Sequence, residues 1–405
     1  MRKLAFVSVW LLVFAIPWEN VVFLPGIGTA SRMFGALAFL AGVAAVMVLR
    51  KGIRLHLLHW LMFCFVLWGG VSYYWSIDQE HTLERLWTYL QLLIMVWLVY
   101  QWVDEAKALK SLLGAYVLGA YVSVFSTVVS YFGGEAAHWH RYSASGFNPN
   151  DIAIILAQGI PMAWYLFQAK WGGRLKWAFF IYPFLAPIAV ALTGSRSGLI
   201  ATLAALLFVL WTAPGLPIRT KLACLVAGVG ATWTGISFVP VYSWGRLATT
   251  GTELFHGGWN YRLSIWEAGV RSFAKNPVLG VGAGAFRAAV EPFLGTGSAS
   301  HNVYLAVLVE QGLVGFVLFA LILAAAVQSS LQLPTLERRM WLVLLGTWGV
   351  SAFAHPWEWR KQTWILFALV VAHAAALVSK RKTEILCSDR GARLHKGSLP
   401  LQVPD

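Results

Sequence analysis

Long apolar stretches separated by short polar gaps run through most of the chain. A helix needs about 20 mostly apolar residues to cross a bilayer. Breaking the sequence at its polar gaps gives twelve such stretches, at 4–18, 33–49, 55–74, 84–103, 111–132, 151–169, 175–194, 197–213, 220–240, 301–327, 340–355 and 361–379. The pattern predicts an all-α polytopic membrane protein with about 12 transmembrane helices.

Composition supports this class. Hydrophobic residues make up 59% of the chain and charged residues 12%, whereas a soluble domain is about a quarter charged. The formal charge of +14 is also seen in nucleic-acid-binding proteins, but the basic residues lie mostly in the short gaps between apolar stretches. We therefore expect contact with membrane lipids and no nucleic-acid partner.

The ends of the chain and its cysteines add little chemistry. Met1-Arg2-Lys3 and the apolar stretch after it resemble a signal peptide, but no small-residue cleavage site follows, so we expect a retained first span. The three cysteines, Cys64, Cys224 and Cys387, have neither disulfide nor metal-ligand spacing.

The distribution of lysine and arginine predicts the orientation. With a cytoplasmic N-terminus, twenty of the 31 basic residues fall on the cytoplasmic side and eleven on the outer side, as the positive-inside rule requires. An even number of spans places both termini in the cytoplasm. We expect a single membrane domain over 1–405, a long periplasmic loop at 241–300 and a basic cytoplasmic tail at 380–405.

The outer set contains nine arginines and two lysines. Arginine binds phosphate through two parallel hydrogen bonds, so an anionic substrate at this face is one interpretation. Arginines that only extend from helix ends toward water are the alternative.

The long loop carries one periodic segment. Leu263, Trp266, Val270 and Phe273 recur at helical spacing, which predicts an amphipathic helix lying in the membrane interface. Lys275-Asn276-Pro277 ends it.

Two polar stretches on the outer face precede this loop. In the first, at 141–151, Asn150 or Asp151 is the expected cap of the next helix, whereas Arg141 has no such local role. The second, at 193–198, is a tight turn with Arg196 at its centre. It is either a plain connection or a place where glycine lets the backbone approach an anion that Arg196 neutralises.

Two further stretches lie in and after the loop. Arg262 begins the predicted interfacial helix, and the glycines of 276–284 favour a close-packed turn over a phosphate cradle, because no strand precedes them. His301 stands at the start of a helix, where the helix dipole lowers its pKa and leaves a neutral imidazole able to accept a proton. His301 is therefore the candidate general base, and a hydrogen-bonded helix-end histidine is the alternative.

Other titratable residues are less suited to chemistry. Glu310 lies nine residues after His301, on the opposite side of an ideal helix and about 13.5 Å deeper, so we expect it to pair with another span. No nearby cluster of acidic residues or cysteines completes a metal site with His138 and His140. His355, in a tryptophan-rich turn, either borders a pocket or belongs to an interfacial belt.

Taken together, these stretches resemble the O-antigen ligase and polymerase family. The matching pieces, in order, are Gly146-Phe147-Asn148-Pro149-Asn150, Ser195-Arg196-Ser197-Gly198, Arg262 with Trp266, Asn276 to Gly284, and His301-Asn302 with Glu310 and Gly312. Their order and spacing resemble the family over roughly 140–315.

The resemblance implies a glycosyltransferase of GT-C architecture in lipopolysaccharide biosynthesis, acting at the periplasmic face of the bacterial inner membrane. The donor would be O-antigen on undecaprenyl diphosphate and the acceptor a sugar hydroxyl of lipid A-core oligosaccharide, with inversion and without metal, nucleotide sugar or other cofactor. Arg196 and Arg262, with Arg141, would hold the diphosphate. His301 would be the general base, and Asn302, Asn150 and Glu310 would support the site.

Three alternatives remain at this point. Within the family, a polymerase uses a second lipid-linked glycan as acceptor, and a protein O-oligosaccharyltransferase uses a protein side chain. The lack of a large soluble extension disfavours the protein-directed enzyme, and the basic segment 241–300, suited to a second anionic lipid, favours a ligase. In another class, a transporter or flippase for an anionic lipid should carry charges and broken helices near the bilayer midplane, where only Glu310 is expected.

Overall fold

The computed structural model describes residues 1–26, 28–136, 141–214, 217–219, 221–222 and 260–396. Outside these residues lie His138 and His140, nearly all of the predicted span at 220–240, the first part of the predicted loop at 241–259, and the end of the tail at 397–405.

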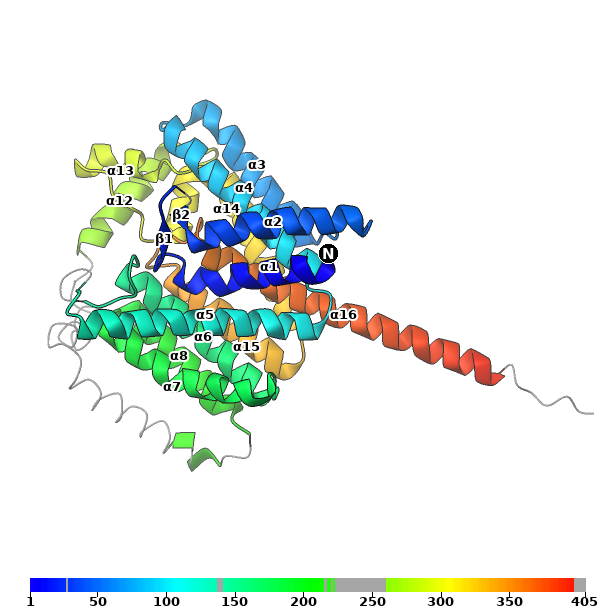
Figure 1. Ribbon diagram of the computed structural model, residues 1–405. Helices are drawn as coiled ribbons and strands as arrows, with labels where there is room; N and C mark the ends of the chain where they lie inside the picture. The colour runs from blue at the N-terminus through cyan, green and yellow to red at the C-terminus, as the bar shows by residue number, and fades with distance from the viewer. Residues whose placement is uncertain (27, 137–140, 215–216, 220, 223–259, 397–405) are drawn as a thin grey trace, which may run out of the picture.

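Helices build the described part of the molecule (Figure 1). The α-helices are α1 (Arg2–Ala15), α2 (Ala30–Val48), α3 (Leu57–Val71), α4 (Gln79–Trp102), α5 (Ala106–Phe132), α6 (Pro149–Gln168), α7 (Lys176–Leu192), α8 (Arg196–Thr212), α12 (Asn260–Lys275), α13 (Phe286–Leu294), α14 (Val303–Leu331), α15 (Thr335–Ser351) and α16 (Lys361–Lys396). Short 3-10 helices occupy Ile16–Trp18, Ser72–Trp75 and Gly173–Leu175. The strands β1 (Phe23–Leu24) and β2 (Gly28–Thr29) form a small antiparallel hairpin between α1 and α2.

Eleven of the twelve predicted apolar stretches coincide with helices of the described residues, namely α1 to α8 and α14 to α16. Seven segments there are long and apolar enough to cross a membrane: Ala30–Val48, Leu57–Trp75, Gln79–Trp102, Ala106–Phe132, Gly173–Leu192, Val303–Leu331 and Lys361–Val378. The class of a helical membrane protein with many spans is confirmed. The number twelve remains a prediction.

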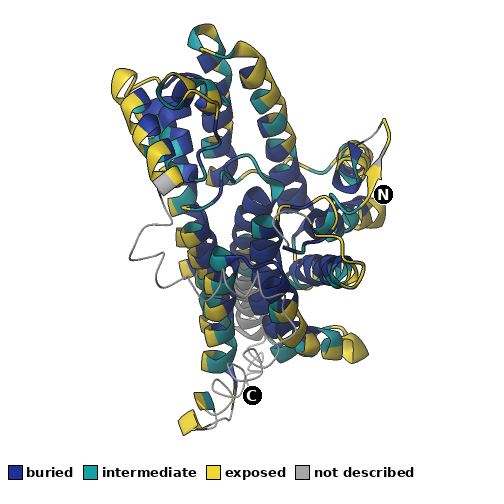
Figure 2. Ribbon diagram, turned by 90° about the vertical axis from the view of Figure 1, so that its left-hand side faces the viewer, coloured by how far each residue is buried: buried dark blue, intermediate teal, exposed yellow. Residues whose placement is uncertain are grey.

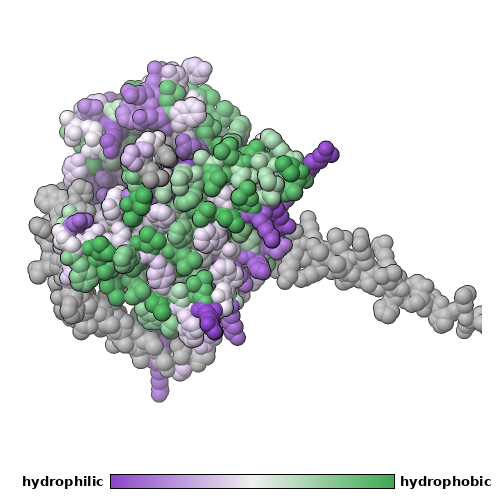
Figure 3. Space-filling model, viewed as in Figure 1, coloured by the Kyte–Doolittle hydropathy of each residue, from purple (hydrophilic) through white to green (hydrophobic). Residues whose placement is uncertain are grey.

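Burial separates inner from outer helices (Figure 2). Helix α6 packs against α5, α7, α8 and α15 and is buried over most of its length. At the periphery, Leu40 and Met47 of α2 are 67% and 70% exposed, and apolar residues cover much of the face seen in Figure 3. Exposed apolar side chains over many helices are what a lipid-facing surface requires.

Helix α14 is broken at Gly312, whose φ is 63° and ψ −165°. The preceding chain fills the break: Val281 N donates to Val309 O at 2.9 Å, Gly282 N to Glu310 O at 2.9 Å, and Leu313 N to Pro277 O at 2.8 Å. Backbone groups that leave a helix inside a bilayer must find such partners. The glycines of 276–284 therefore form a close-packed turn, as predicted.

The break also corrects an expectation. Sequence reasoning assigned broken helices to the rival transporter class, and α14 is such a helix. Its interrupted backbone, however, bonds to residues 277–282 of the same chain, so these groups are occupied by protein.

The helix predicted in the long loop is present as α12, but only part of its predicted apolar face is covered: Trp266 and Phe273 pack against protein, whereas Leu263 and Val270 are exposed. Ile265 and Ala268 are 0% and 3% exposed and pack with α13 and α14, whereas Leu263 and Val270 are 50% and 56% exposed. The apolar positions at 263 and 270 face outward because neighbouring protein, which the sequence pattern does not show, covers the adjacent side of the helix.

Candidate functional site

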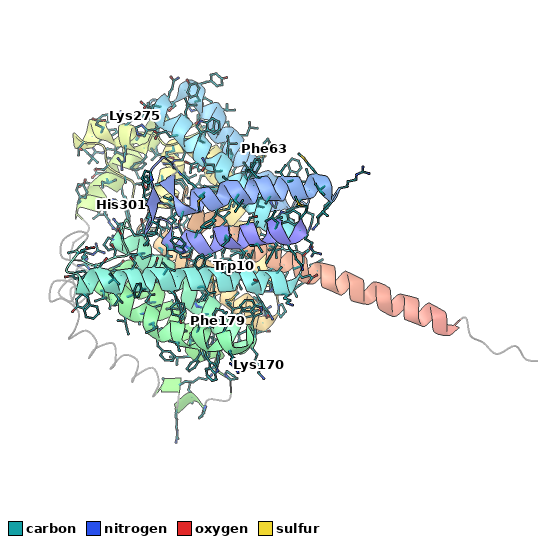
Figure 4. All side chains as sticks on the ribbon, viewed as in Figure 1. Trp10, Phe63, Lys170, Phe179, Lys275 and His301 are labelled. Atoms are coloured by element: carbon teal, nitrogen blue, oxygen red, sulfur yellow. The ribbon has the colours of Figure 1, made fainter. Side chains whose placement is uncertain are left out.

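A cavity of about 510 Å³ opens where several helix ends meet. The beginnings of α4, α6, α13 and α14 and the turn between α15 and α16 form its walls. The lining residues are His81, Glu84, Arg85, Thr88, Asn148, Asn150, Asp151, Gly284, Phe286, Arg287, Ala299, Ser300, His301, Glu310, Ala354, His355, Pro356, Trp357, Glu358, Trp359 and Arg360. Figure 4 places His301 at the left, toward the end of the bundle opposite the N-terminal end of α1.

His301 is set by the backbone on both sides of it. Its φ is +47°, a left-handed value that is uncommon outside glycine. The next residue, Asn302, is the N-cap of α14 and accepts a hydrogen bond from Leu305 N at 3.1 Å. On the other side, Trp266 Nε1 of α12 donates to Ser300 O at 3.0 Å. Two fixed neighbours thus hold His301 at the cavity.

This conformation corrects the expected separation of His301 and Glu310. Helix α14 begins at Val303, so His301 lies before the helix and helical rotation does not govern its direction. His301 and Glu310 consequently line the same cavity.

The imidazole of His301 is neutral at pH 7. Burial, followed by the charges of Arg262 and His355, lowers its pKa to about 4. The direction agrees with the sequence-based expectation, but the causes are desolvation and nearby charge. The positive charge of Arg262 thus acts on this histidine.

In the wall of the cavity, one arginine joins two buried carboxylates. Arg85 Nη1 lies 2.7 Å from Glu358 Oε1 and 3.5 Å from Glu310 Oε2. Glu310 thus pairs with another helix, as expected. Burial raises the pKa of Glu358 to about 7, although the charge of Arg85 opposes this shift. The sequence did not predict Arg85 or Glu358 as neighbours of Glu310. The signal that could have found Arg85 is that a carboxylate inside a membrane needs a cation.

A second contact joins α6 to the turn between α15 and α16. Trp357 Nε1 donates to Asp151 Oδ1 at 2.9 Å, and Arg360 Nη2 lies 3.5 Å from Asp151 Oδ2. His355 is buried and borders the cavity, so of its two interpretations the pocket border is the one that the structure supports.

The expected cap of α6 at Asn150 or Asp151 is wrong. Asn148 caps the helix by accepting from Asn150 N at 2.8 Å, because Pro149 already begins it.

Arg141 connects the first two polar stretches. Its Nε donates to Thr193 O and its Nη2 to Asn150 Oδ1, both at 2.7 Å. Arg196 follows Ser195, the N-cap of α8, and Gly198 packs directly against Ala153 of α6. The start of α8 therefore lies beside the start of α6.

The structure places some of the predicted site residues at the cavity and others outside its lining. Among the described residues, the cavity lining includes Asn150, His301 and Glu310 but not Arg141, Arg196, Arg262 or Asn302. The arginines that line it are Arg85, Arg287 and Arg360. None of these three was proposed from sequence, since each stands outside the four polar stretches. In the described part of the chain, no group of three or more His, Cys, Asp or Glu residues is placed to hold a metal ion.

The model of the O-antigen ligase family matches residues 181–320. This match supports membership of the O-antigen ligase family. The match runs from α7 through most of α14 and so includes Arg196, Arg262 and His301. The family comprises membrane enzymes similar to glycosyltransferases, with lipid-linked polysaccharide substrates. No curated protein matches the chain.

Proposed function

We propose that this chain is an O-antigen ligase. It transfers O-antigen polysaccharide from undecaprenyl diphosphate to a sugar hydroxyl of lipid A-core at the periplasmic face of the inner membrane. The observation that carries the proposal is His301: a neutral imidazole that lines a cavity at one end of the bundle, with the charges of Arg262 and Arg287 acting on it.

The proposed reaction is a single displacement without a metal. The acceptor hydroxyl oxygen forms a bond to the anomeric carbon, and the bond from that carbon to the diphosphate oxygen breaks. The diphosphate leaves with the electron pair, and His301 takes the hydroxyl proton. One direct attack inverts the configuration at the anomeric carbon.

The arginines stabilise the leaving group in this proposal. The charge of Arg262 acts on His301. Arg196 begins α8 beside the start of α6, where the buried Arg141 binds Asn150. None of these three arginines lines the cavity, so the diphosphate would extend from the cavity toward them. Fixed cations near a poorly solvated site stabilise a departing diphosphate without reorganisation. The bound diphosphate would also offset the charge of Arg262 and raise the pKa of His301 toward neutrality, making it a stronger base.

The broken helix α14 is the one observation that favours a transporter. In that class, interrupted backbone faces the substrate, whereas here residues 277–282 occupy it. We therefore retain the transferase, with a polymerase as the alternative within the family. Supplying lipid A-core or a second lipid-linked glycan as the only acceptor distinguishes ligase from polymerase.

The test is transfer by the purified full chain in lipid vesicles, with His301→Ala and Arg196→Ala as variants. We expect each to lower the rate by at least about a hundred-fold. Lys275→Ala, at the far end of α12 from Arg262, is the matched control and should keep normal activity. Normal rates in both site variants would contradict the assignment. Loss of activity in EDTA with rescue by divalent ions would contradict the metal-free mechanism.

A further inference from the structure

The turn at 354–360 between α15 and α16 forms a continuous wall of the cavity, since every residue in it lines the space. Its backbone is tied down: Thr363 Oγ1 donates to Trp357 O at 2.8 Å, and Trp364 Nε1 donates to Glu358 O at 2.8 Å. The guanidinium carbons of Arg85 and Arg360 lie 5.4 Å and 4.3 Å from the ring centre of Trp359. The wall is thus preorganised.

Three buried polar atoms of this turn have no hydrogen-bond partner among the described residues. They are His355 Nε2, Glu358 Oε2 and Arg360 Nε. The His355 and Glu358 residues are only 4% and 1% exposed. Buried groups of this kind nearly always have a partner, because leaving one unpaired is costly. A molecule that enters the cavity can supply these partners.

The hydrogen-bonding character of the unpaired atoms indicates which kind of molecule fits the turn. His355 Nδ1 lies 3.0 Å from Ser351 O, so Nδ1 carries the hydrogen and Nε2 is an acceptor. Glu358 Oε1 already binds Arg85, which leaves Oε2. With its pKa raised by burial to about 7, this carboxyl group both accepts and donates near neutral pH.

A sugar ring matches this set better than a phosphate does. Each sugar hydroxyl donates one hydrogen bond and accepts others, whereas an ionised phosphate only accepts. The acceptors His355 Nε2 and Glu358 Oε2 would therefore repel a diphosphate, whereas together with the donor Arg360 Nε they can bind neighbouring hydroxyls. The turn faces the same cavity as His301, where a reacting sugar has to lie.

We propose that the turn at 354–360 is a subsite for an uncharged sugar ring of a glycan substrate, with His355 and Glu358 binding adjacent hydroxyls. The inference rests on the proposed function, because it takes glycans as the substrates. The ring belongs either to the acceptor or to the donor glycan, and the experiment separates these two sources.

The first arm is steady-state kinetics with both substrates varied. In His355→Asn, the amide nitrogen replaces Nδ1 and keeps the bond to Ser351 O, while the acceptor at Nε2 is lost. We expect KM for one glycan substrate to rise about ten-fold, with kcat changing less than about three-fold. Glu358→Gln, which still accepts from Arg85, should raise the same KM about three-fold.

Glu267→Gln is the matched control for the carboxylate, since Glu267 is exposed on α12 and pairs with Arg271. It should leave both KM values unchanged. A rise in KM for the acceptor assigns the ring to the acceptor, and a rise for the donor assigns it to the donor. If neither KM rises in His355→Asn, or only kcat falls, the subsite is wrong.

The second arm measures binding without catalysis. Delipidated core oligosaccharide and the free donor oligosaccharide are titrated separately into the full chain carrying His301→Ala, by calorimetry. Adding His355→Asn should weaken one of them about ten-fold. Unchanged binding of both would mean that only water satisfies these atoms, which overturns the proposal. If oligosaccharide binding depends on His355 but the wild-type chain transfers nothing, the proposed function fails while the subsite stands.

Discussion

At the scale of single residues, the left-handed backbone of His301 has to be stabilised by its neighbours. A non-glycine residue in this conformation costs about 1 kcal/mol or more, and the cap at Asn302 and the bond from Trp266 to Ser300 O hold it in place. Strain kept at a cavity is typical of functional positions. The same surroundings partly bury the imidazole and keep it neutral.

The acid limb of activity should therefore lie far below the usual range of histidine. The pKa of His301 is about 4 in the folded chain, against about 6.5 when unfolded. Its neutral form is present above both values, so its contribution to stability is lost as pH falls from about 6.5 toward 4. The variant Glu358→Gln removes the titration near pH 7. In this variant we expect kcat/KM to fall as the pH is lowered, with a midpoint near pH 4.

The measurement is kcat/KM against pH in that variant, with thermal unfolding followed in parallel to separate loss of activity from loss of fold. A midpoint near 6.5 would show that His301 is solvated during the reaction or is not the base.

Residues that line the cavity were predictable where local sequence carried the signal. His301 lies at a predicted helix start, and Glu310 is a carboxylate in an apolar stretch, which predicts a cationic partner. The pair of Arg85 and Glu358 could not be predicted in this way, because 273 positions separate the two residues. Only tertiary packing brings Arg85 Nη1 to 2.7 Å from Glu358 Oε1. Arg287 and Arg360 were counted as outer-face cations, but nothing in their local patterns distinguished them from arginines at helix ends.

At the scale of elements, the interrupted helix α14 and the glycine segment before it form one unit. Gly280 and Gly312 both have positive φ, and each lies against the backbone of the other segment. A side chain at either position would force these backbones apart. Glu310 sits within the same contact, so the unit also places a carboxylate at the cavity.

Gly312→Ala should therefore destabilise the chain by at least about 2 kcal/mol, since its φ of 63° is strained for alanine and the new Cβ would collide with Val278 O. Gly346→Ala is the matched control. It lies in α15 with open space around it, so its stability should be unchanged or raised by up to about 1 kcal/mol. Unfolding in lipid or detergent measures both, and equal stability of the two variants would contradict the role of Gly312.

The division of the chain into apolar stretches and polar gaps predicted most of the long helices, with shifts at their ends. Polar gaps mark where a chain leaves lipid, and this signal does not depend on tertiary contacts. The break in α14 and the buried face of α12 were beyond such a pattern. Both depend on which segment packs alongside, and hydropathy does not distinguish a protein neighbour from a lipid one.

At the scale of the whole molecule, the cavity and the N-terminal end of α1 lie at opposite ends of the bundle (Figures 1 and 4). Hydrophilic residues gather over α12 and α13 at the cavity end in Figure 3. With the excess of basic residues on the predicted cytoplasmic side, this arrangement favours a periplasmic cavity.

Cysteine labelling in intact cells tests this orientation. In a chain whose three native cysteines are replaced, Thr296→Cys, in the exposed loop after α13, should react with a membrane-impermeant maleimide. Arg174→Cys, in the exposed turn between α6 and α7, should react only after permeabilisation. The reverse pattern would place the cavity in the cytoplasm and exclude the proposed periplasmic reaction.

The closure of the α14 break also has a consequence for biogenesis. Residues 277–282 leave the ribosome before α14 does, so the partner of the interrupted backbone is already synthesised when that helix reaches the insertion machinery. Because lipid offers no hydrogen bonds, we expect the two to enter the bilayer as a pair. Gly312→Ala should accordingly reduce the amount of chain integrated into the membrane as well as its stability afterwards, which pulse labelling with carbonate extraction would measure.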